Sequence, residues 1–550
     1  MSGPAVPSVA ETSRFRRDPD VVMRLARMGA AYPNRLSFLR VLLRRLQSEG
    51  WRFDRPMFDF DARGVGRAVY RAIGPERTYS LVAFGHDLPD DQRSDRVIAT
   101  AWDATFTLFA GTPDAADLDR LAANVPLQEA GRISPRELSL SRANRSVRLF
   151  EHVVQSLSEG RQPDAEKLAE TGYLMRTTAV YGSGKFGAAS REDIAARPEL
   201  KAPFQVEMLS VWLTRSFIVD LVEHIAHARG GDGAVRLDPA IRRMLGVGNS
   251  TGLGMAPFLV RHPVLLNNWM AAREEALARV RAINASDDAA VADFTRALDA
   301  ARLNAGLWQS EHPVQQAKLA ELRSGLDRLA AHVAGSWDRR GRTPWDALWR
   351  WGEAELGVEA QEALVALMLE PHGALVDDLA DAMSDDTPTF AIDGAMTAGA
   401  LRNLLRRNYA WALGTDYGAH DACARFWYVS EDKLEPRLGE RHDEPGADRE
   451  LPLDIGRQAA ALAAILDKRP AAEPIARLLL EKPELRLMVR RVQLTEGRPF
   501  AEIRDNLLSA ELLPIDMLRC KLAYFGATRF DPRSDRWLRI SLFQDAPHPD

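Results

Sequence analysis

The longest helical pattern of the chain is FQVEMLSVWLTRSFIVDLVEHIAHAR, from Phe204 to Arg229. Its apolar side chains recur three or four positions apart, as on the buried stripe of an α-helix, and Gly230-Gly231 follows where a helix is expected to stop. We expect this helix to be a central scaffold. It joins two glycine-rich segments, which are the strongest indications of a functional site.

Helical periodicity dominates the chain after Gly111. Ser134-Pro135-Arg136-Glu137 predicts a helix start, because serine can cap, proline fits the first turn and glutamate can close a capping box. Further helices are predicted over Pro263–Ile283, Asp287–Arg302, Val314–Ala334, Val358–Leu369, Met396–Leu413 and Ile455–Leu466. No repeat period relates them, which favours an irregular multi-helix domain over a solenoid.

The N-terminal part has a different pattern. Two helical stretches, Asp18–Ala30 and Asn34–Ser48, precede runs rich in β-branched and aromatic residues at Val65–Ile73, Thr78–Phe84 and Val97–Phe109. These runs predict a small antiparallel sheet, covered by the two helices. The predicted fold class is therefore mainly α, with a small N-terminal α+β domain.

The length of 550 residues favours two or three domains. We expect a disordered tail over residues 1–17, the small α+β domain over 18–112 and a large helical domain over 113–534, with a subdivision near 336–344. Residues 535–550 are expected to form a strand and a tail. Their strand, from Trp537 to Phe543, alternates apolar and polar side chains and is predicted to return to the edge of the N-terminal sheet.

Composition excludes several classes of partner. The chain has 72 Lys+Arg and 77 Asp+Glu, a formal charge of −5, so no large positive field favours nucleic acid. Two cysteines, Cys423 and Cys520, are too few for a disulfide framework and favour the cytoplasm. The most apolar stretch, Phe217–Ile225, is interrupted by charges, so no membrane span is predicted. Self-association into a homo-oligomer is left open.

The first glycine-rich segment, YGSGKFG from Tyr181 to Gly187, formally fits the G-x-G-x-x-G pattern of dinucleotide sites. That pattern must lie between a strand and a helix of a parallel βαβ unit, whereas this segment is predicted among helices without parallel strands. It is not a Walker loop either, because Ala179 stands where that motif requires its first glycine and Phe186 stands where it requires Ser or Thr. Lys185 remains as a cation that could hold a carboxylate or phosphate, with Tyr181 and Ser183 nearby. The alternative is an exposed turn.

The second segment, GVGNSTGLGMAP from Gly246 to Pro257, contains four glycines. Such a stretch inside a helical domain indicates either close approach to a ligand or tight packing against another backbone, and we favour a ligand. The groups that would orient it are Asn249, Ser250 and Thr251. Arg261 and His262 lie near the start of the next helix, where a carboxylate could bind. For His262, a capping or packing role is the alternative.

A third segment, from Tyr409 to Tyr428, is dense in aromatic and titratable residues. His420 is a candidate general base, Tyr417 a candidate proton donor and Arg425 a candidate substrate ligand. The alternative is that the aromatic side chains belong to a core. The polar stretch after it, 430–454, is long enough to act as a lid.

The helix between the glycine-rich segments carries Glu223, His224 and His227, of which Glu223 with His227, or the two histidines, could ligate a metal ion. Their spacing matches no zinc motif and no third ligand is evident, so no metal is predicted.

These patterns favour an enzyme, of unknown class, that binds a small anionic substrate where the two glycine-rich segments meet the Asp416–Tyr428 segment. Lys185 and Arg261 would hold the anion, and His420 would transfer a proton. Two alternatives remain: a non-catalytic interaction protein, or an oxidoreductase that binds a cofactor on the glycine-rich segments. The sequence does not assign a cofactor.

Overall fold

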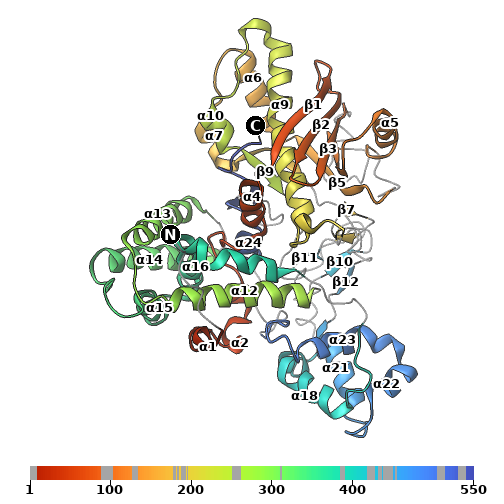
Figure 1. Cartoon of the computed structure of the whole chain (residues 1–550), viewed down its shortest axis with the longest axis vertical. Coiled ribbons are helices and arrows are strands. Elements are labelled where there is room, and N and C mark those ends of the chain that lie inside the picture. Colours follow the sequence, from red (N-terminus) through yellow and green to blue (C-terminus); the bar gives the residue numbers. More distant parts are fainter. Residues whose placement is uncertain are drawn as a thin grey trace. The chain divides into compact units, whose positions relative to one another are not determined.

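The chain forms two compact units in a computed structural model (Figure 1). We call Met1–Leu36 with Gly252–Tyr524 the helical unit, and Ser37–Thr251 with Phe525–Asp550 the sheet unit. The structure describes residues 9–87, 103–126, 134–145, 147–177, 181–182, 185–186, 194, 196–249, 262–309, 313–384, 391–417, 428–430, 436–437, 450–452, 455–504, 514–530 and 540–549.

The sheet unit is built on a nine-stranded sheet in the order β1-β2-β3-β4-β5-β6-β9-β14-β13. Its strands are β1 Arg52–Phe60, β2 Gly66–Ile73, β3 Thr78–Gly85, β4 Ala104–Ala110, β5 Glu137–Arg145, β6 Tyr173–Thr177, β9 Gly246–Asn249, β13 Arg529–Phe530 and β14 Ile540–Leu542. Neighbouring strands are antiparallel, except that β6 and β9 run parallel.

The predicted small antiparallel sheet is therefore wrong, although the chain is mainly helical as expected. The sheet is mixed, and it takes strands from far beyond residue 112. The predicted helix start at Ser134–Glu137 instead leads into β5, where Leu138 and Leu140 are buried in alternation with polar positions. The Ser134 hydroxyl does contact the Glu137 carboxylate at 3.1 Å, but this polar turn precedes a strand.

The late alternating run does return to the sheet, as β14. It does not form the edge, however, because β14 lies between β9 and β13. The alternation of Ile540, Ser541 and Leu542 was sufficient to identify the strand. Its place in the order was not encoded locally, since β9 is hundreds of residues earlier in the chain.

Helix α9 (Gln205–Gly230) lies against the sheet and matches the predicted scaffold helix (Figure 1). Phe217 of α9 packs its ring 5.3 Å from that of Phe106 on β4. This face of the sheet is thus covered by α9, whereas the two N-terminal helices had been expected to cover it. On the other face, Leu118 and Leu121 of α5 (Ala115–Asn124) join a cluster with Val82 and Phe109.

The other elements of the sheet unit lie around this sandwich. They are α4 Phe38–Ser48, α6 Val147–Ser158, α7 Ala165–Thr171, η3 Pro198–Leu200, η4 Gly231–Gly233, α10 Pro239–Met244 and the hairpin of β7 Tyr181–Gly182 with β8 Lys185–Phe186.

The helical unit contains most of the remaining helices. These are α1 Val9–Thr12, η1 Ser13–Phe15, α2 Pro19–Val22, α3 Leu25–Met28, α12 Pro263–Arg281, α13 Asp288–Leu307, α14 Pro313–Gly335, α15 Pro344–Glu355, α16 Val358–Leu369, η5 Glu370–His372, α17 Gly373–Val376, η6 Asp377–Met383, α18 Ala398–Asn408, α19 Ala410–Leu413, α21 Ile455–Leu466, α22 Ile475–Glu481, η8 Pro483–Leu485 and α23 Arg486–Leu494. Helix α24 (Pro514–Phe525) ends this unit, and β10 Tyr428–Ser430, β11 Pro436–Arg437 and β12 Glu450–Pro452 form a small sheet within it.

Residues 9–17, where the sequence predicts a disordered tail, contribute buried side chains to the helical unit. Thr12, Phe15 and Arg17 are all less than one-tenth exposed. A segment that buries such groups is held by specific contacts, which are described below. The expected domain boundaries at 112 and 534 concern independent folding and stay a prediction.

Candidate functional site

The strand that precedes the first glycine-rich segment pairs in the sheet with the first residues of the second segment. Thr177 at the end of β6 is the register partner of Asn249 at the end of β9, and the two strands run in the same direction. The buried Thr177 hydroxyl donates a hydrogen bond to the Gly248 carbonyl oxygen at 3.1 Å. The chain continues from Thr177 toward Tyr181–Gly187, and from Asn249 directly into the rest of the second segment. Both segments therefore leave the same end of one parallel pair.

The expectation that no parallel strands surround the first segment is wrong. Strand β6 precedes it, α9 follows it and the parallel strand β9 comes next. Within the segment, Tyr181 pairs with Phe186 and Gly182 with Lys185 in the β7–β8 hairpin, so Gly182, the first glycine of the pattern, lies in a strand. A dinucleotide fingerprint requires its glycines at the start of the helix, where the pyrophosphate binds. The hairpin thus argues against a dinucleotide site.

Packing accounts for the first two glycines of the second segment. A Cβ atom on Gly246 would lie 2.5 Å from the Leu542 carbonyl oxygen, and one on Gly248 would lie 2.4 Å from the Tyr173 ring. Neither gap admits a side chain. Tight packing, rather than close approach to a ligand, therefore explains Gly246 and Gly248. Gly252 and Gly254 lie outside the described residues.

The predicted site residues are divided between the two units. Tyr181, Lys185 and Asn249 lie on β7, β8 and β9 of the sheet unit, and His262 and Tyr417 belong to the helical unit. The remaining candidates lie outside the described residues: Ser183, Ser250, Thr251, Arg261, His420 and Arg425.

His262 occupies the N-cap position of α12, immediately before Pro263. Its side chain is exposed and makes no capping hydrogen bond. The helix start was thus placed correctly, and an exposed imidazole at a helix N-terminus is compatible with contact to an anion.

Tyr417 has a contact that favours a structural role. Its hydroxyl donates to the Ala412 carbonyl oxygen at 2.8 Å, and the Arg457 guanidinium lies 5.9 Å from its ring. The hydroxyl also leaves no room for a side chain on Gly456 of α21. To act as the predicted proton donor, Tyr417 would first have to release the main-chain carbonyl.

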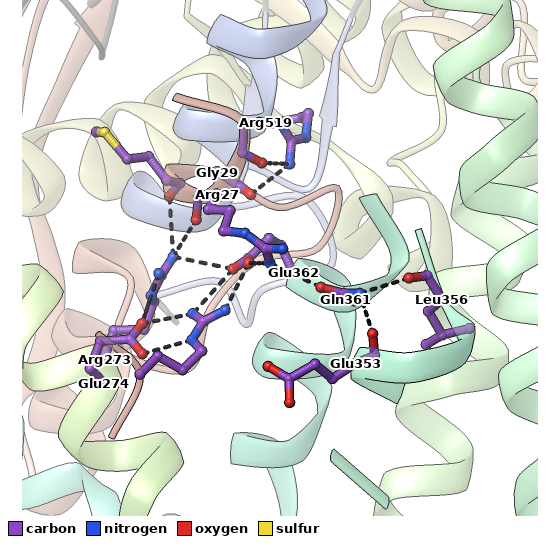
Figure 2. Close-up of polar contacts among 12 residues, drawn as sticks. Arg27, Gly29, Arg273, Glu274, Glu353, Leu356, Gln361, Glu362 and Arg519 are labelled. Atoms are coloured by element: carbon purple, nitrogen blue, oxygen red, sulfur yellow. Dashed lines mark hydrogen bonds and ion pairs between the residues drawn. The ribbon is translucent and has the colours of Figure 1, made fainter. Parts of the chain in front are cut away.

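Sequence reasoning missed a buried charged network in the helical unit, which Figure 2 shows in part. Arg17 donates to Glu274 at 2.8 Å and to Glu362 at 2.8 Å, while Arg27 reaches Glu362 at 3.0 Å and Arg273 reaches Glu274 at 2.8 Å. The side chains of Arg17, Glu274 and Glu362 are at most 4% exposed. The network ties the N-terminal segment to α12 and α16.

The charges of this network stabilise one another, which favours a structural role. Burial by itself raises the pKa of Glu274, but Arg17 and Arg273 more than offset it and lower the pKa to about 2. The same carboxylates raise the pKa of Arg17, against the effect of burial. Because each of these charges is neutralised by a fixed partner, the network offers no group poised to exchange a proton near neutral pH.

Two of the three candidate metal residues on α9, Glu223 and His224, have other partners. Glu223 accepts a hydrogen bond from the Leu237 amide at 3.1 Å, and His224 Nε2 lies 3.0 Å from the Asp61 carbonyl oxygen. Over the described part of the chain, no three His, Cys, Asp or Glu side chains come together as a metal site would require. Every helix in that same part is too short or too polar to cross a bilayer.

Comparison with protein-family models, with curated proteins and with solved structures finds no match to this chain. Its function must therefore be argued from its own residues.

Proposed function

We propose that the chain is an enzyme that binds a small carboxylate- or phosphate-bearing substrate at the carboxyl ends of β6 and β9. The observation that supports this most is the pairing of Thr177, four residues before the first glycine-rich segment, with Asn249 of the second segment. Loops that follow neighbouring parallel strands leave the same edge of a sheet, and ligands commonly bind at that edge.

In this proposal each segment contributes polar groups to one anion site. Lys185 supplies the cation, with Tyr181 and Ser183 beside it, and Asn249, Ser250 and Thr251 donate hydrogen bonds from the other side. A lysine ammonium with several neutral donors suits a carboxylate or a phosphate, since both need charge and more than one hydrogen bond.

The remaining candidate residues would supply the acid–base chemistry and further contacts to the anion. We propose that His420 transfers the proton, that Arg261 and Arg425 contact the anionic group and that the exposed His262 assists at the start of α12. Tyr417 is a weaker candidate because of its hydrogen bond to Ala412.

One observation favours a rival function. Gly246 and Gly248 are required by strand packing, so they do not by themselves indicate a ligand. This is the result expected if the chain is a non-catalytic interaction protein in which the glycine-rich segments have a structural role. The third alternative, an oxidoreductase, loses support because Gly182, the first glycine of the dinucleotide pattern, lies in the β7–β8 hairpin.

A thermal-shift screen separates these possibilities. The purified chain is heated with organic acids, phosphates, coenzyme A esters, nucleotides or metal ions, and a ligand present at about 100 times its dissociation constant should stabilise the chain by about 2.7 kcal/mol. We expect one or more small anions to raise the melting temperature. An intrinsic flavin or nicotinamide absorbance in the purified protein would instead support the oxidoreductase.

Two matched variants assign the ligand to this site. Lys185→Ala should lose most of the shift, whereas Lys167→Ala, which removes an exposed lysine from α7 of the same unit, should keep it. A full shift in Lys185→Ala would contradict the anion-binding role of Lys185. An absence of any shift across all the anions would count against the proposed function as a whole.

A further inference from the structure

A second feature of the sheet unit is a cavity of about 620 Å³ on the α9 side of the sheet. Its walls come from β1, β2, the second half of α9 and the segment 234–242, with Pro549 at one side. None of its lining residues belongs to β6, β9 or a glycine-rich segment, so the inference that follows is independent of the proposed function. A cavity of this size holds one small organic ligand.

The acidic groups in the cavity wall are already neutralised. Asp220, one of the lining residues, accepts a hydrogen bond from the Tyr70 hydroxyl at 2.7 Å and from Arg55 Nη1 at 2.6 Å. Burial, together with the charge of Asp220, raises the pKa of Tyr70, so this hydroxyl stays protonated and keeps donating. The carboxylate therefore does not present an open negative charge to a ligand.

The two other carboxylates are paired as well. Glu223 accepts from the Leu237 amide at 3.1 Å and lies 3.9 Å from Arg242 Nη1. Asp54, at the rim, receives Arg71 Nε at 2.7 Å. Four arginines and three carboxylates line the cavity, so one positive charge remains in excess even with neutral histidines.

The polar groups left over are mainly hydrogen-bond donors. The Arg236 guanidinium is exposed and has no partner among the described residues, and Arg242 Nε is buried without one. Ser216 is only 2% exposed, yet its hydroxyl has no hydrogen-bond partner in the described part of the chain. Ser216 Oγ and Arg242 Nε are thus two buried donors without a partner in the described part of the chain, and both belong to residues that line the cavity.

His227 and His224 complete the polar part of the wall. His227 is exposed in the last turn of α9. His224 Nε2 must carry a hydrogen to bond the Asp61 carbonyl oxygen at 3.0 Å, because a carbonyl can only accept. Neither imidazole introduces a negative charge into the cavity wall.

Apolar side chains supply the rest of the wall: Phe53, Phe58, Leu213, Val235 and Pro549. The Phe53 ring is fixed edge-on against Trp212, with ring centroids 4.4 Å apart. Pro549 is held in place because Trp212 Nε1 donates to the Pro547 carbonyl oxygen at 3.1 Å and Arg215 binds the Ala546 carbonyl oxygen at 2.6 Å. The cavity thus combines hydrogen-bond donors that have no partner among the described residues with apolar side chains that are held in place.

We infer that this cavity binds a small organic oxyanion. Its carboxylate or phosphate accepts hydrogen bonds from Arg236, Arg242 and Ser216, and its ring or alkyl part lies on Phe53 and Phe58. An isolated inorganic ion would leave the apolar wall hydrated, and a neutral ligand would leave the donors unmatched.

The test is isothermal titration of the full chain with four probes: benzoate, phenyl phosphate, inorganic phosphate and benzamide. Binding of benzoate or phenyl phosphate supports the inference. Benzamide, the neutral isostere of benzoate, and inorganic phosphate should each bind at least about tenfold more weakly than the tighter organic anion. Benzamide binding as tightly as benzoate, or no binding of either organic anion up to about 10 mM, would overturn it.

Variants then locate the binding. Arg236→Met should weaken the organic anion about tenfold, since a charge-assisted hydrogen bond is lost. Arg52→Met is the matched control, because Arg52 is an exposed β1 arginine outside the cavity wall, and it should bind like the parent chain. Ser216→Ala should also weaken binding, by about threefold or more. Equal affinities of Arg236→Met and Arg52→Met would place the anion elsewhere and overturn the inference.

Discussion

Thr177 and Asn249 are direct register partners across the parallel strands β6 and β9, and each is the last residue of its strand. Along the sequence they are separated by the hairpin β7–β8 and the whole of α9. The first glycine-rich segment therefore follows the end of β6, and the second continues past the paired end of β9. This relationship is the physical basis for treating them as parts of one site.

The Thr177 hydroxyl is predicted to help hold the two strands together. Thr177→Val keeps the shape of the side chain but removes the hydrogen bond to Gly248, which should lower the free energy of unfolding by about 1 kcal/mol. Thr177→Ser retains the hydroxyl and should keep that hydrogen bond. The measurement is urea denaturation of both variants. If Thr177→Val matched the parent chain, the hydroxyl would contribute nothing to the pairing.

Gly248 is predicted to be intolerant of any side chain. Gly248→Ala forces a methyl group into the Tyr173 ring and should cost about 2 kcal/mol of unfolding free energy, as overpacked cores do. Gly233→Ala, in the same unit, meets no atom within 4 Å and should be close to neutral. Similar stabilities for the two variants in denaturant titrations would refute the packing explanation of Gly248.

The Glu274 carboxylate is predicted to stabilise the helical unit at neutral but not at acidic pH. Its pKa falls from 4.5 to about 2 on folding, so the folded state holds the proton less tightly than the unfolded state. The contribution is complete above about pH 4.5 and is lost as the pH falls toward 2, on the order of 3 kcal/mol in all. Glu274→Gln should therefore be destabilising at pH 7 by about 3 to 5 kcal/mol, because Arg17 and Arg273 lose their partner.

A pH series distinguishes this effect from general acid denaturation. The difference in unfolding free energy between the parent chain and Glu274→Gln should shrink between pH 4.5 and the lowest pH at which both fold. Glu484→Gln is the control, since that carboxylate is 65% exposed and its removal should change little at any pH. A pH-independent difference for Glu274→Gln would contradict the lowered pKa.

Arg215 is predicted to fix residues 546–549 beside the cavity. This arginine is 1% exposed and donates to the carbonyl oxygens of Leu245 at 2.5 Å, Arg243 at 2.6 Å and Ala546 at 2.6 Å. Arg215→Met leaves these carbonyls unpaired, which should cost about 3 kcal/mol and speed hydrogen exchange in residues 543–549. Arg52→Met is the control. If the hydrogen-exchange rates of residues 543–549 were the same in the two variants, contacts other than those of Arg215 would hold this segment.

Long periodic segments could be predicted from the sequence, while short strands could not. Helix α9 was located to within a residue, and α16 and α21 were predicted with their observed bounds, because an apolar stripe over three or more turns is a local property. Strands β6 and β9 span only five and four residues, too few for alternation to show, and their parallel pairing is a long-range contact.

The residues of the cavity and of the buried network also divide into those that a local sequence pattern indicates and those that it does not. Glu223, His224 and His227 stood out as polar residues on one side of an apolar helix, and Ser216 and Asp220 continue that stripe toward its N-terminus. The stripe marks the wall of the cavity, but Arg236, Arg242 and the β1 and β2 side chains that complete it are encoded elsewhere. The buried network was invisible for a similar reason, since Arg17 and Glu274 are 257 positions apart.

Cysteine cross-linking tests the central claim most directly, because it requires no knowledge of the substrate. Ser183→Cys and Ser250→Cys are combined in a chain with Cys423 and Cys520 replaced by alanine, and a short bismaleimide is added. The Asp59→Cys and Arg67→Cys pair, register partners on β1 and β2 that are not buried, serves as the positive control. If the glycine-rich segments form one site, the Ser183–Ser250 pair should cross-link within the same chain. Cross-linking of the control pair alone would contradict the account.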